Sequence, residues 1–377
     1  MKSILVTGSA GFIGANLVLR LLEEGFQGEP VSIVGLDNMN SYYDPSLKEY
    51  RLQQIEKRAL NDQPSTFNFI KGDLADKPLV DRLFAEHRFD IVVNLAAQAG
   101  VRYSIENPDA YIQSNIIGFY NILEASRHAK ELATLQAASN AAEKSAHCPP
   151  STTHYAGVQH LIYASSSSVY GGNKKVPFST DDNVDHPISL YAATKKSNEL
   201  FAHCYSKLYD IPTTGLRFFT VYGPAGRPDM AYFGFTNKLL KDDTIQIYNY
   251  GNCRRDFTYV DDIVEGIVRV MGKAPERMTG DDGLPVPPYK VYNIGGGQPE
   301  NLLDFVRILQ EELVRAKVLP QDYDFEAHKQ LVPMQPGDVP ATYADAAALE
   351  RDFGFTPKIT LREGLRHFAE WYKEYYG

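Results

Sequence analysis

The residues with the clearest chemical potential lie in two nearby stretches in the middle of the chain. One is the serine run from Ser165 to Gly171, and the other is Tyr191-Ala-Ala-Thr-Lys195, which opens a predicted helix. Residues four apart lie on one face of a helix, so Tyr191 and Lys195 should point the same way. A free tyrosine has a pKa of about 10, and a neighbouring ammonium group favours its phenolate form. With a serine hydroxyl beside them, these groups could take a proton from an alcohol.

A glycine-rich turn near the N-terminus supports a catalytic interpretation of these motifs. Ile4 to Val6 is typical of a buried parallel strand, and Gly8-Ser-Ala-Gly-Phe-Ile-Gly14 follows, leading into an apolar pattern with helical period. Such glycines allow a tight turn, close approach of a pyrophosphate and close packing of helix on strand. The next predicted strand, Val31 to Leu36, ends in Asp37, which can bind an adenosine ribose and would repel a 2'-phosphate. The unit therefore predicts an NAD site.

None of these motifs is specific alone. Glycines in a turn between strand and helix often serve packing only, and the spacing G-x-x-G-x-x-G differs from the standard fingerprint. A tyrosine and a lysine four apart usually mark a solvated helix face, and a serine run is usually a polar loop. Their order along one chain favours proton transfer from an alcohol whose carbon gives a hydride to NAD+.

Two further apolar runs extend the predicted parallel sheet. Phe67 to Ile70 is followed by Asp73, which could accept a hydrogen bond from an adenine amino group or cap the next helix. Asp90 to Ala97 leads into a loop of small residues at the carboxyl edge of the sheet, where open α/β sheets bind ligands. Ala96, Ala97 and Arg102 are therefore candidates for lining a cleft, and the expected fold class is α/β.

Composition limits the remaining possibilities. The chain has 377 residues, of which 44% are hydrophobic, enough for one large domain or two closely joined ones. A formal charge of -9 argues against a nucleic-acid partner. We expect no membrane association and a cytoplasmic location, because no leader pattern or membrane-length apolar run is present. The three cysteines are scattered, so no metal site is expected. A segment rich in Ala, Ser and Thr, at about residues 130–157, is predicted to be a surface insertion with a helical start.

From Gly8 through Tyr191 and Lys195 to Phe353-Gly-Phe-Thr-Pro357, the sequence resembles the extended short-chain dehydrogenases of the NAD-dependent nucleotide-sugar epimerase/dehydratase family. The resemblance implies a Rossmann-type doubly wound parallel sheet for NAD over residues 1–215. It also implies a smaller α/β lobe for a UDP-sugar, mainly over 216–377, with a segment around 256–295 returning to the first domain. It makes Ser166 catalytic beside Tyr191 and Lys195. The expected NAD-binding residues are Gly8, Gly11, Phe12, Ile13, Gly14, Asp37, Asn38, Asp73, Leu74, Leu95, Ala96, Ala97, Gln98, Asn115, Tyr191, Lys195, Phe218 and Val221.

The residues after Ser166 separate the reactions of this family. Its dehydratases carry Asp-Glu there, and its UDP-glucuronate decarboxylases carry a glutamate just before the valine, whereas this chain has Ser167 and Ser168. Without a second acid or base beside the nicotinamide, elimination of water is disfavoured. Oxidation and re-reduction of one carbon is the expected reaction, with NAD tightly bound and regenerated in each turnover.

The run from Leu216 to Met230 is similar to the corresponding stretch of UDP-glucuronate 4-epimerases in this family. By that resemblance, Phe219 and Val221 flank the nicotinamide and Thr220 touches the sugar. Arg227 can bind a hexuronate carboxylate through two parallel hydrogen bonds; a surface arginine in a Gly/Pro loop is the alternative. The expected substrate-binding residues are Arg102, Ser166, Ser167, Ser168, Thr220, Arg227, Arg255 and Asp338.

The diphosphate end of the predicted site contains one departure from the neutral-sugar enzymes. The stretch from Gly251 to Asp262 matches a diphosphate-binding segment, with Arg255 on a phosphate and Asp261-Asp262 expected as the cap of a helix. UDP-galactose 4-epimerases place an arginine shortly before a Gly-Asp pair, but here Gln335 precedes Gly337-Asp338. This difference weakens the neutral-hexose interpretation and leaves Asp338 as a candidate for the uridine ribose.

The sequence therefore predicts a UDP-hexuronate 4-epimerase, with a UDP-glucose or UDP-N-acetylhexosamine 4-epimerase as the nearest rival. A catalytically silent NAD-binding scaffold is a rival of another class, against which the intact Tyr191 and Lys195 argue. A net-oxidising dehydrogenase is disfavoured, because none of the three cysteines lies in a recognisable nucleophile context. Helices over Ala110 to His128 and Tyr191 to Tyr209 pair across a homodimer in the family, so we expect a homodimer.

Overall fold

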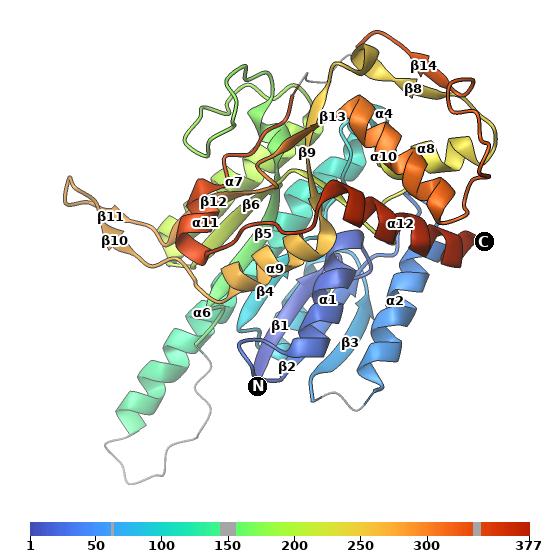
Figure 1. The fold of residues 1–377 in the computed structure, drawn as a ribbon. Helices are drawn as coiled ribbons and strands as arrows, with labels where there is room; N and C mark the ends of the chain where they lie inside the picture. Colours follow the sequence, from blue (N-terminus) through green and yellow to red (C-terminus); the bar gives the residue numbers. More distant parts are fainter. Residues whose placement is uncertain (62–63, 144–155, 335–340) are drawn as a thin grey trace.

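A seven-stranded parallel sheet, in the order β12-β6-β5-β4-β1-β2-β3, forms the centre of the molecule (Figure 1). The computed structural model describes residues 1–61, 64–143, 156–334 and 341–377. The strands are β1 (Lys2–Thr7), β2 (Val31–Asp37), β3 (Thr66–Lys71), β4 (Ile91–Asn94), β5 (His160–Ser166), β6 (Thr213–Phe218) and β12 (Tyr289–Ile294). The apolar runs expected to form strands do so, but β3 is an edge strand without a buried residue, and β4 ends at Asn94, before the expected Ala97. The predicted α/β class and Rossmann-type sheet are confirmed.

Helices cover both faces of this sheet, and alternate residues of each strand contact opposite faces. Ile4 and Val6 of β1 pack with helices α1 and α9, whereas Leu5 packs with α3, α6 and α7. The first layer also includes α2, and the ion pair Arg20–Glu265 joins α1 to α9 at 3.2 Å. The helices are α1 (Phe12–Glu24), α2 (Ser46–Ala59), α3 (Lys77–His87), α6 (Gly118–Glu143), α7 (Leu190–Tyr209) and α9 (Val260–Met271).

The direction in which the chain adds strands reverses between β1 and β4. From β1 the sheet grows to one side through β2 and β3, and the chain then crosses back to place β4 on the other side of β1. Open α/β sheets bind ligands beside the carboxyl ends of the strands at such a switch point. The glycine-rich turn after β1 and the loops after β4, β5 and β6 all leave this edge. The topology therefore brings the predicted NAD residues and the serine run to one place.

The C-terminal part of the chain builds a smaller lobe above that edge and returns one strand to the sheet (Figure 1). Its small sheets have the orders β13-β9-β7 and β14-β8, and β10 pairs with β11. β12 pairs with β6 in the central sheet. The strands are β7 (Thr220–Tyr222), β8 (Ile245–Ile247), β9 (Arg254–Tyr259), β10 (Met278–Thr279), β11 (Pro285–Val286), β13 (Pro299–Asn301) and β14 (Lys329–Leu331); the helices are α8 (Ala231–Leu239), α10 (Leu302–Arg315), α11 (Ala347–Phe353) and α12 (Leu361–Tyr376). The domain division at residue 215 stays a prediction.

The helical segment predicted over Ala110 to His128 differs from expectation. The short helices α4 (Tyr103–Glu106) and α5 (Pro108–Tyr111) come first, a π-helical turn η1 (Ile112–Ile117) follows, and α6 then continues to Glu143. The helix thus enters the proposed insertion at 130–157, whose residues 144–155 lie outside the described part of the chain. A π-helical turn is frequent at functional sites, and this one contains Asn115.

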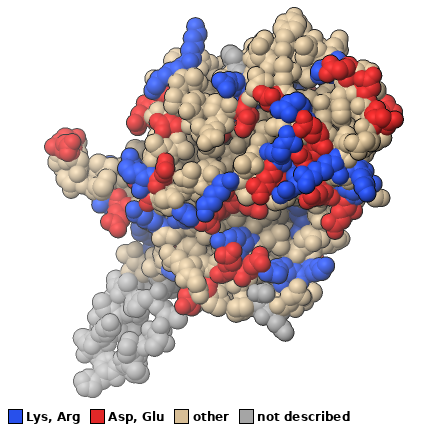
Figure 2. Space-filling model, viewed as in Figure 1, with Lys and Arg blue, Asp and Glu red and all other residues tan. Residues whose placement is uncertain are grey.

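The described surface carries mixed charge and no helix suited to a membrane. Figure 2 shows acidic and basic side chains interspersed on the face that carries α1 and α12, where Arg362 of α12 pairs with Glu311 and Glu312 of α10. Among the described helices, none is long and apolar enough to cross a membrane.

A buried histidine in the central sheet should make stability fall in mild acid. His160, in β5, is 1% exposed, and burial lowers its pKa to about 4. An unfolded chain binds this proton near pH 6.5, so as the pH falls from 6.5 toward 4 the unfolded state gains protons that the folded state does not. This difference in proton binding lowers the free energy of unfolding by about 2 kcal/mol at pH 5.

His160→Gln, which can still hydrogen bond Thr214 Oγ1, at 2.8 Å from Nε2 in the wild type, should remove that loss in urea unfolding compared at pH 7.5 and 5.0. His203 is exposed on α7, and His203→Gln serves as the control. Equal acid losses in wild type and His160→Gln would contradict the expectation.

Candidate active site

The turn between β1 and α1 has the geometry that a dinucleotide phosphate requires. Gly8 has φ +70°, and a Cβ on Gly14 would lie 2.1 Å from the Gly8 carbonyl oxygen, so neither position accepts a side chain. A Cβ on Gly11 would meet only that same carbonyl group, at 2.9 Å from its oxygen, so its other side is open. Helix α1 begins without a side-chain cap and without acidic residues in its first turn. Its free N–H groups can therefore bind an anion.

Asp37, at the end of β2, is fixed by two backbone N–H groups and has a cation beside it. Its Oδ1 accepts from Met39 N at 2.8 Å and its Oδ2 accepts from Ala10 N at 3.2 Å. Lys48 Nζ of α2 lies 3.6 Å from Asp37 Oδ1, and both side chains are 7% exposed. Burial lowers the pKa of Lys48, and Asp37 opposes that shift. The local charge at the predicted ribose site is therefore balanced, which the sequence did not indicate.

Asp73 follows β3 and faces the same site. Its Oδ2 accepts from Asn38 Nδ2 at 2.8 Å, and its Oδ1 accepts from Ala75 N at 2.8 Å. The cap of α3 is Asp76, whose side chain accepts from Leu79 N. The alternative that Asp73 caps the next helix is therefore wrong, and its proposed contact with adenine stays a prediction.

A cleft of about 550 Å³ runs along the carboxyl edge of the sheet and into the C-terminal lobe. Every residue predicted to bind NAD lines it except Asn115, and of the predicted substrate residues that the structure describes, all line it except Arg102. One continuous cleft thus joins the glycine turn to the serine run and to Arg227. The binding roles of these residues stay predictions.

Tyr191 lies in the first turn of α7, which Ser189 caps by accepting from Ala192 N at 3.1 Å. Burial raises the pKa of Tyr191, while the Ser166 hydroxyl and the Arg227 guanidinium lower it. The ring of Tyr111 packs edge-on against that of Tyr191, with centroids 6.0 Å apart. Tyr191 is therefore a partly buried acid whose phenolate needs nearby positive charge.

Lys195 is one turn further along α7, on the same side as Tyr191, and both line the cleft. Its Nζ donates to the Ala164 carbonyl of β5 at 2.9 Å, and burial lowers its pKa to about 7. The expected common orientation is confirmed. The ammonium bonds a backbone carbonyl here, so its predicted effect on the Tyr191 phenolate stays a prediction.

The serine run bends into the cleft because β5 ends in a 3-10 turn, η2 (Ser167–Tyr170). Ser166 Oγ caps this turn by accepting from Ser168 N at 3.1 Å and donates to Ser168 Oγ at 3.1 Å. Ser165 points to the other side of the strand, where its Oγ donates to Glu199 Oε1 at 2.7 Å. Ser166, Ser167 and Ser168 therefore line the cleft, whereas the Ser165 hydroxyl joins the buried network behind it.

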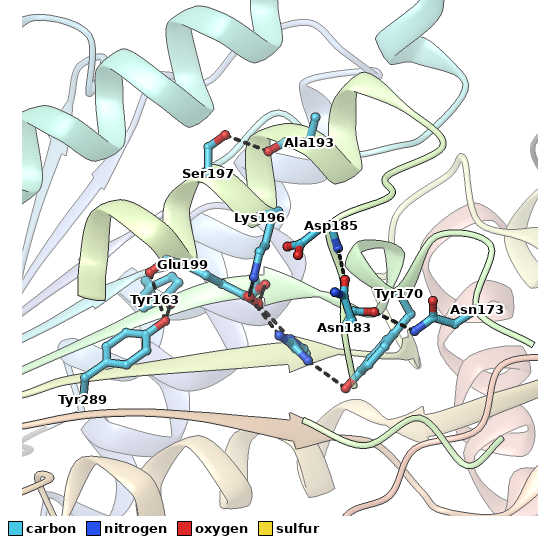
Figure 3. Close-up of polar contacts among 12 residues, drawn as sticks. Tyr163, Tyr170, Asn173, Asn183, Asp185, Ala193, Lys196, Ser197, Glu199 and Tyr289 are labelled. Atoms are coloured by element: carbon cyan, nitrogen blue, oxygen red, sulfur yellow. Dashed lines mark hydrogen bonds and ion pairs between the residues drawn. The ribbon is translucent and has the colours of Figure 1, made fainter. Parts of the chain in front are cut away.

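That network fixes α7 to the sheet behind the catalytic face. Glu199, one turn beyond Lys195, binds Arg217 of β6 through Nε at 2.8 Å and Nη2 at 2.9 Å. Arg217 Nη1 donates to the Tyr170 hydroxyl at 3.0 Å, which donates to Asn293 Oδ1 at 2.6 Å. Figure 3 shows Glu199 and Tyr170 at opposite ends of these contacts. The pair connects α7, β6, η2 and β12 and sets the place of Tyr191 relative to the serines.

Arg227 lies in the loop between β7 and α8 and already has a carboxylate partner. Its Nε donates to Asp229 Oδ1 at 3.0 Å and its Nη2 to Asp229 Oδ2 at 2.5 Å. Tyr42, which lines the cleft, donates its hydroxyl to Asp229 Oδ2 at 3.2 Å. Burial and the Asp229 charge raise the pKa of Tyr42 to about 12, so Tyr42 remains a donor at neutral pH.

Several predicted site residues have other positions. The Arg102 guanidinium lies over the ring of Tyr248, 5.6 Å from its centroid, beside the cleft lining. Asn115 is a brace, because its Oδ1 accepts from Gln98 N at 2.8 Å and its Nδ2 donates to Gln98 O at 3.0 Å. Asp338 and Gln335 lie outside the described residues.

The acidic pair expected to cap a helix after β9 also differs, because α9 already begins at Val260. Asp262 instead accepts from Lys358 N at 3.0 Å and from Ile359 N at 2.9 Å. It therefore ties α9 to the segment before α12, and the capping role predicted for Asp261-Asp262 is wrong.

Comparison with known proteins agrees with this geometry. A model of the NAD dependent epimerase/dehydratase family matches residues 4–295. The chain is 49% identical over 379 residues to Protein CapI of Staphylococcus aureus, with 99% of each chain covered. The chain belongs to the NAD dependent epimerase/dehydratase family.

Two further relatives carry activity names. The chain is 43% identical over 381 residues to UDP-glucuronate 4-epimerase 4 of Arabidopsis thaliana, covering 99% of this chain and 76% of that protein. The crystal structure of UDP-glucuronic acid 4-epimerase from Bacillus cereus, in complex with UDP-glucuronic acid and NAD, aligns with a TM-score of 0.76 at 30% identity and 99% coverage of both chains.

The residues of this epimerase/dehydratase family member fit an NAD molecule. The open side of Gly11 and the uncapped start of α1 suit a pyrophosphate, and Asp37 and Asp73 offer carboxylate oxygens at the ends of β2 and β3. Tyr191 and Lys195 lie further along the same cleft, where a nicotinamide would be placed. The expected cofactor, NAD, is confirmed by the match to an NAD dependent family, of which the Bacillus cereus structure contains NAD.

Three residues in or beside the cleft are not among those that the sequence motifs predict. The sequence motifs assign no role to Lys48 or to Tyr42. Asp229 stands two residues after Arg227 in a loop, where no periodic pattern assigns a direction to a side chain. Lys48 alone had a usable signal, because it is a lysine in the helix that follows the strand ending in Asp37.

Proposed function

We propose that the chain is a UDP-glucuronate 4-epimerase, which interconverts UDP-glucuronate and UDP-galacturonate. The observation that carries the proposal is the position of Arg227, which lines the same cleft as Tyr191 and the serine run. A cation beside the base suits a sugar that carries a carboxylate. Relatives with this activity name match nearly the whole chain.

Tyr191 takes the proton of the sugar 4'-hydroxyl and later returns it to the same oxygen. A bound NAD+ would supply the acceptor for the C4' hydride and its donor on the other face of the carbon. The Ser166 hydroxyl, which acts on Tyr191, hydrogen bonds the reacting oxygen. Burial lowers the pKa of Lys195 to about 7. When Lys195 is protonated, its ammonium group supplies positive charge to the Tyr191 phenolate.

The presence of serines in place of carboxylates disfavours elimination of water. Ser167 and Ser168 line the cleft where an acid and a base would be needed to eliminate water. A 4-keto uronate is a β-keto acid and loses CO2 when its carboxylate aligns with the carbonyl. Holding the carboxylate out of that alignment is the role we propose for Arg227 with Thr220 and the serine run.

Substitution of two arginines of the cleft should distinguish recognition of the sugar carboxylate from recognition of the diphosphate. Arg227→Ala should lower kcat/KM for UDP-glucuronate by about 100-fold, because a charge-assisted bidentate contact is lost, and should leave the Kd for UDP unchanged. Arg255→Ala, the matched control, should weaken UDP itself, because Arg255 is proposed to bind a phosphate. Turnover is followed by the anomeric proton signals with no cofactor added, and binding by calorimetry.

Other outcomes would change the assignment. Conversion of UDP-glucose in place of UDP-glucuronate by the wild type would favour the neutral-sugar epimerase. Bound NAD without turnover of either sugar, even with NAD added, would favour a silent NAD-binding scaffold. An Arg227→Ala enzyme that keeps its activity on UDP-glucuronate would contradict the carboxylate role of Arg227.

We also propose a homodimer formed through α6 and α7. Large apolar side chains are exposed on both helices, namely Tyr120 of α6 and Leu200, Phe201 and Leu208 of α7. A second copy of the same face would cover them, because an isologous interface pairs one patch with itself. Light scattering should give twice the chain mass, and a monomer would contradict this. Cytoplasmic location and the contact of Asp338 with the uridine ribose stay predictions.

A further inference from the structure

The arginine proposed to hold the substrate carboxylate is paired with a carboxylate of the chain itself. Asp229 occupies the Nε–Nη2 edge of Arg227, which is one of the two edges at which a guanidinium can hold a carboxylate through parallel hydrogen bonds. The side chains of Arg227 and Asp229 are 25% and 31% exposed, so neither is locked in a core. Arg227 lines the cleft, whereas Asp229 lies beside the lining.

The surrounding contacts hold Asp229 in its charged form next to the cleft. Met230 N donates to Arg227 O at 3.1 Å, which closes a turn around the pair. Burial disfavours the Asp229 carboxylate, but the charge and hydrogen bonds of Arg227 and the Tyr42 hydroxyl outweigh burial and lower its pKa. Asp229 is therefore an anion at neutral pH, and its charge opposes the attraction of Arg227 for a second carboxylate.

A 4-epimerase makes a specific demand on this arginine. The hydride leaves and returns on opposite faces of C4', so the 4-keto sugar must turn over in the cleft between the two steps. Its carboxylate must then let go of Arg227. A partly buried guanidinium left without a partner is costly, and an anion already bonded to its other edge reduces that cost.

We propose that Asp229 is a resident counter-ion that competes with the substrate carboxylate for Arg227, which weakens the hold on the uronate enough for the sugar to turn over. The proposal rests on the proposed function. Asp229 acts through Arg227 and is thus a positioning residue. It sets how tightly the uronate is held in the ground state and how readily the carboxylate is released.

Binding without turnover tests the charge competition directly. In a Tyr191→Phe background, Asp229→Asn should tighten the Kd for UDP-glucuronate by about tenfold, because a competing charge beside Arg227 is removed. The Kd for UDP-glucose, which lacks the carboxylate, should not change. Asp229→Glu keeps the charge and should behave like the parent. Asp304→Asn, which removes the partner of Arg307 in an exposed pair on α10, should have no effect on either Kd.

Turnover tests the release step. With Tyr191 intact, Asp229→Asn should lower both KM and kcat for UDP-glucuronate, whereas a merely structural role would raise KM or lower the melting temperature. A Kd for UDP-glucuronate that is unchanged or weaker in Asp229→Asn, or a kcat that does not fall, would overturn the proposal. A wild-type enzyme with no activity on UDP-glucuronate would instead overturn the proposed function, and this inference with it.

Discussion

Replacing Tyr191 with phenylalanine should lower kcat for UDP-glucuronate by about a thousandfold, the range expected when a positioned acid–base group is removed. The ring should keep its place, because it packs against Tyr111 and begins a capped helix. The hydroxyl that is lost is the group acted on by Ser166 and Arg227. NAD should remain bound, because the glycine turn and Asp37, which are predicted to bind it, are unchanged.

The measurement is conversion of UDP-glucuronate followed by NMR, together with the NAD content of the purified protein. Tyr205→Phe is a matched control on the same helix, because the Tyr205 hydroxyl donates to Glu124 on α6 at 2.6 Å, outside the cleft lining. It should keep wild-type turnover. A Tyr191→Phe enzyme that retains more than a tenth of wild-type kcat would show that another group moves the proton.

The first βαβ unit could be predicted because its determinants are local. Glycine spacing, a buried strand and a terminal carboxylate follow one another within 37 residues, and each places the next through backbone geometry. Tyr191 and Lys195 were predictable for the same reason, since a helix of known period fixes their common face. The position of the serine run could also be predicted, because the run directly follows one predicted strand.

The residues that lie away from their expected positions, or that the sequence did not indicate, depend on contacts between distant segments. Asn115 was assigned to NAD, but a π-helical turn aims its side chain at the Gln98 backbone. Asp229 reaches Arg227 only because a turn brings them together, and Tyr42 joins them from a segment 187 residues away. Sequence spacing carries no information on such contacts.

The position of Glu199 near the site could have been predicted, because it lies four residues after Lys195 on the same helix. What the sequence did not give is its partner, Arg217, on a strand of the central sheet. The pairing makes Glu199 part of the frame behind the site, and its removal is the second change with a large expected effect.

Glu199→Gln should lower the free energy of unfolding by about 3–5 kcal/mol, because it leaves the buried charge of Arg217 without a partner. Both side chains are 4% exposed, and the Ser165 hydroxyl would also lose its charged acceptor. Asp81→Asn is the control, since the Lys77–Asp81 pair is 41% and 44% exposed and should contribute less than about 1 kcal/mol.

Urea unfolding of both variants, with kcat measured on the same samples, separates stability from activity. The double variant Glu199→Met/Arg217→Met should recover most of the lost stability, because apolar side chains of similar volume often replace a buried ion pair at little cost. It should still have a lower kcat, since Ser165 next to Ser166 and the helix of Tyr191 would no longer be tied to β6. If Glu199→Gln loses no more stability than Asp81→Asn, the buried pair does not hold the site together, and the packing of α7 against β5 must do so.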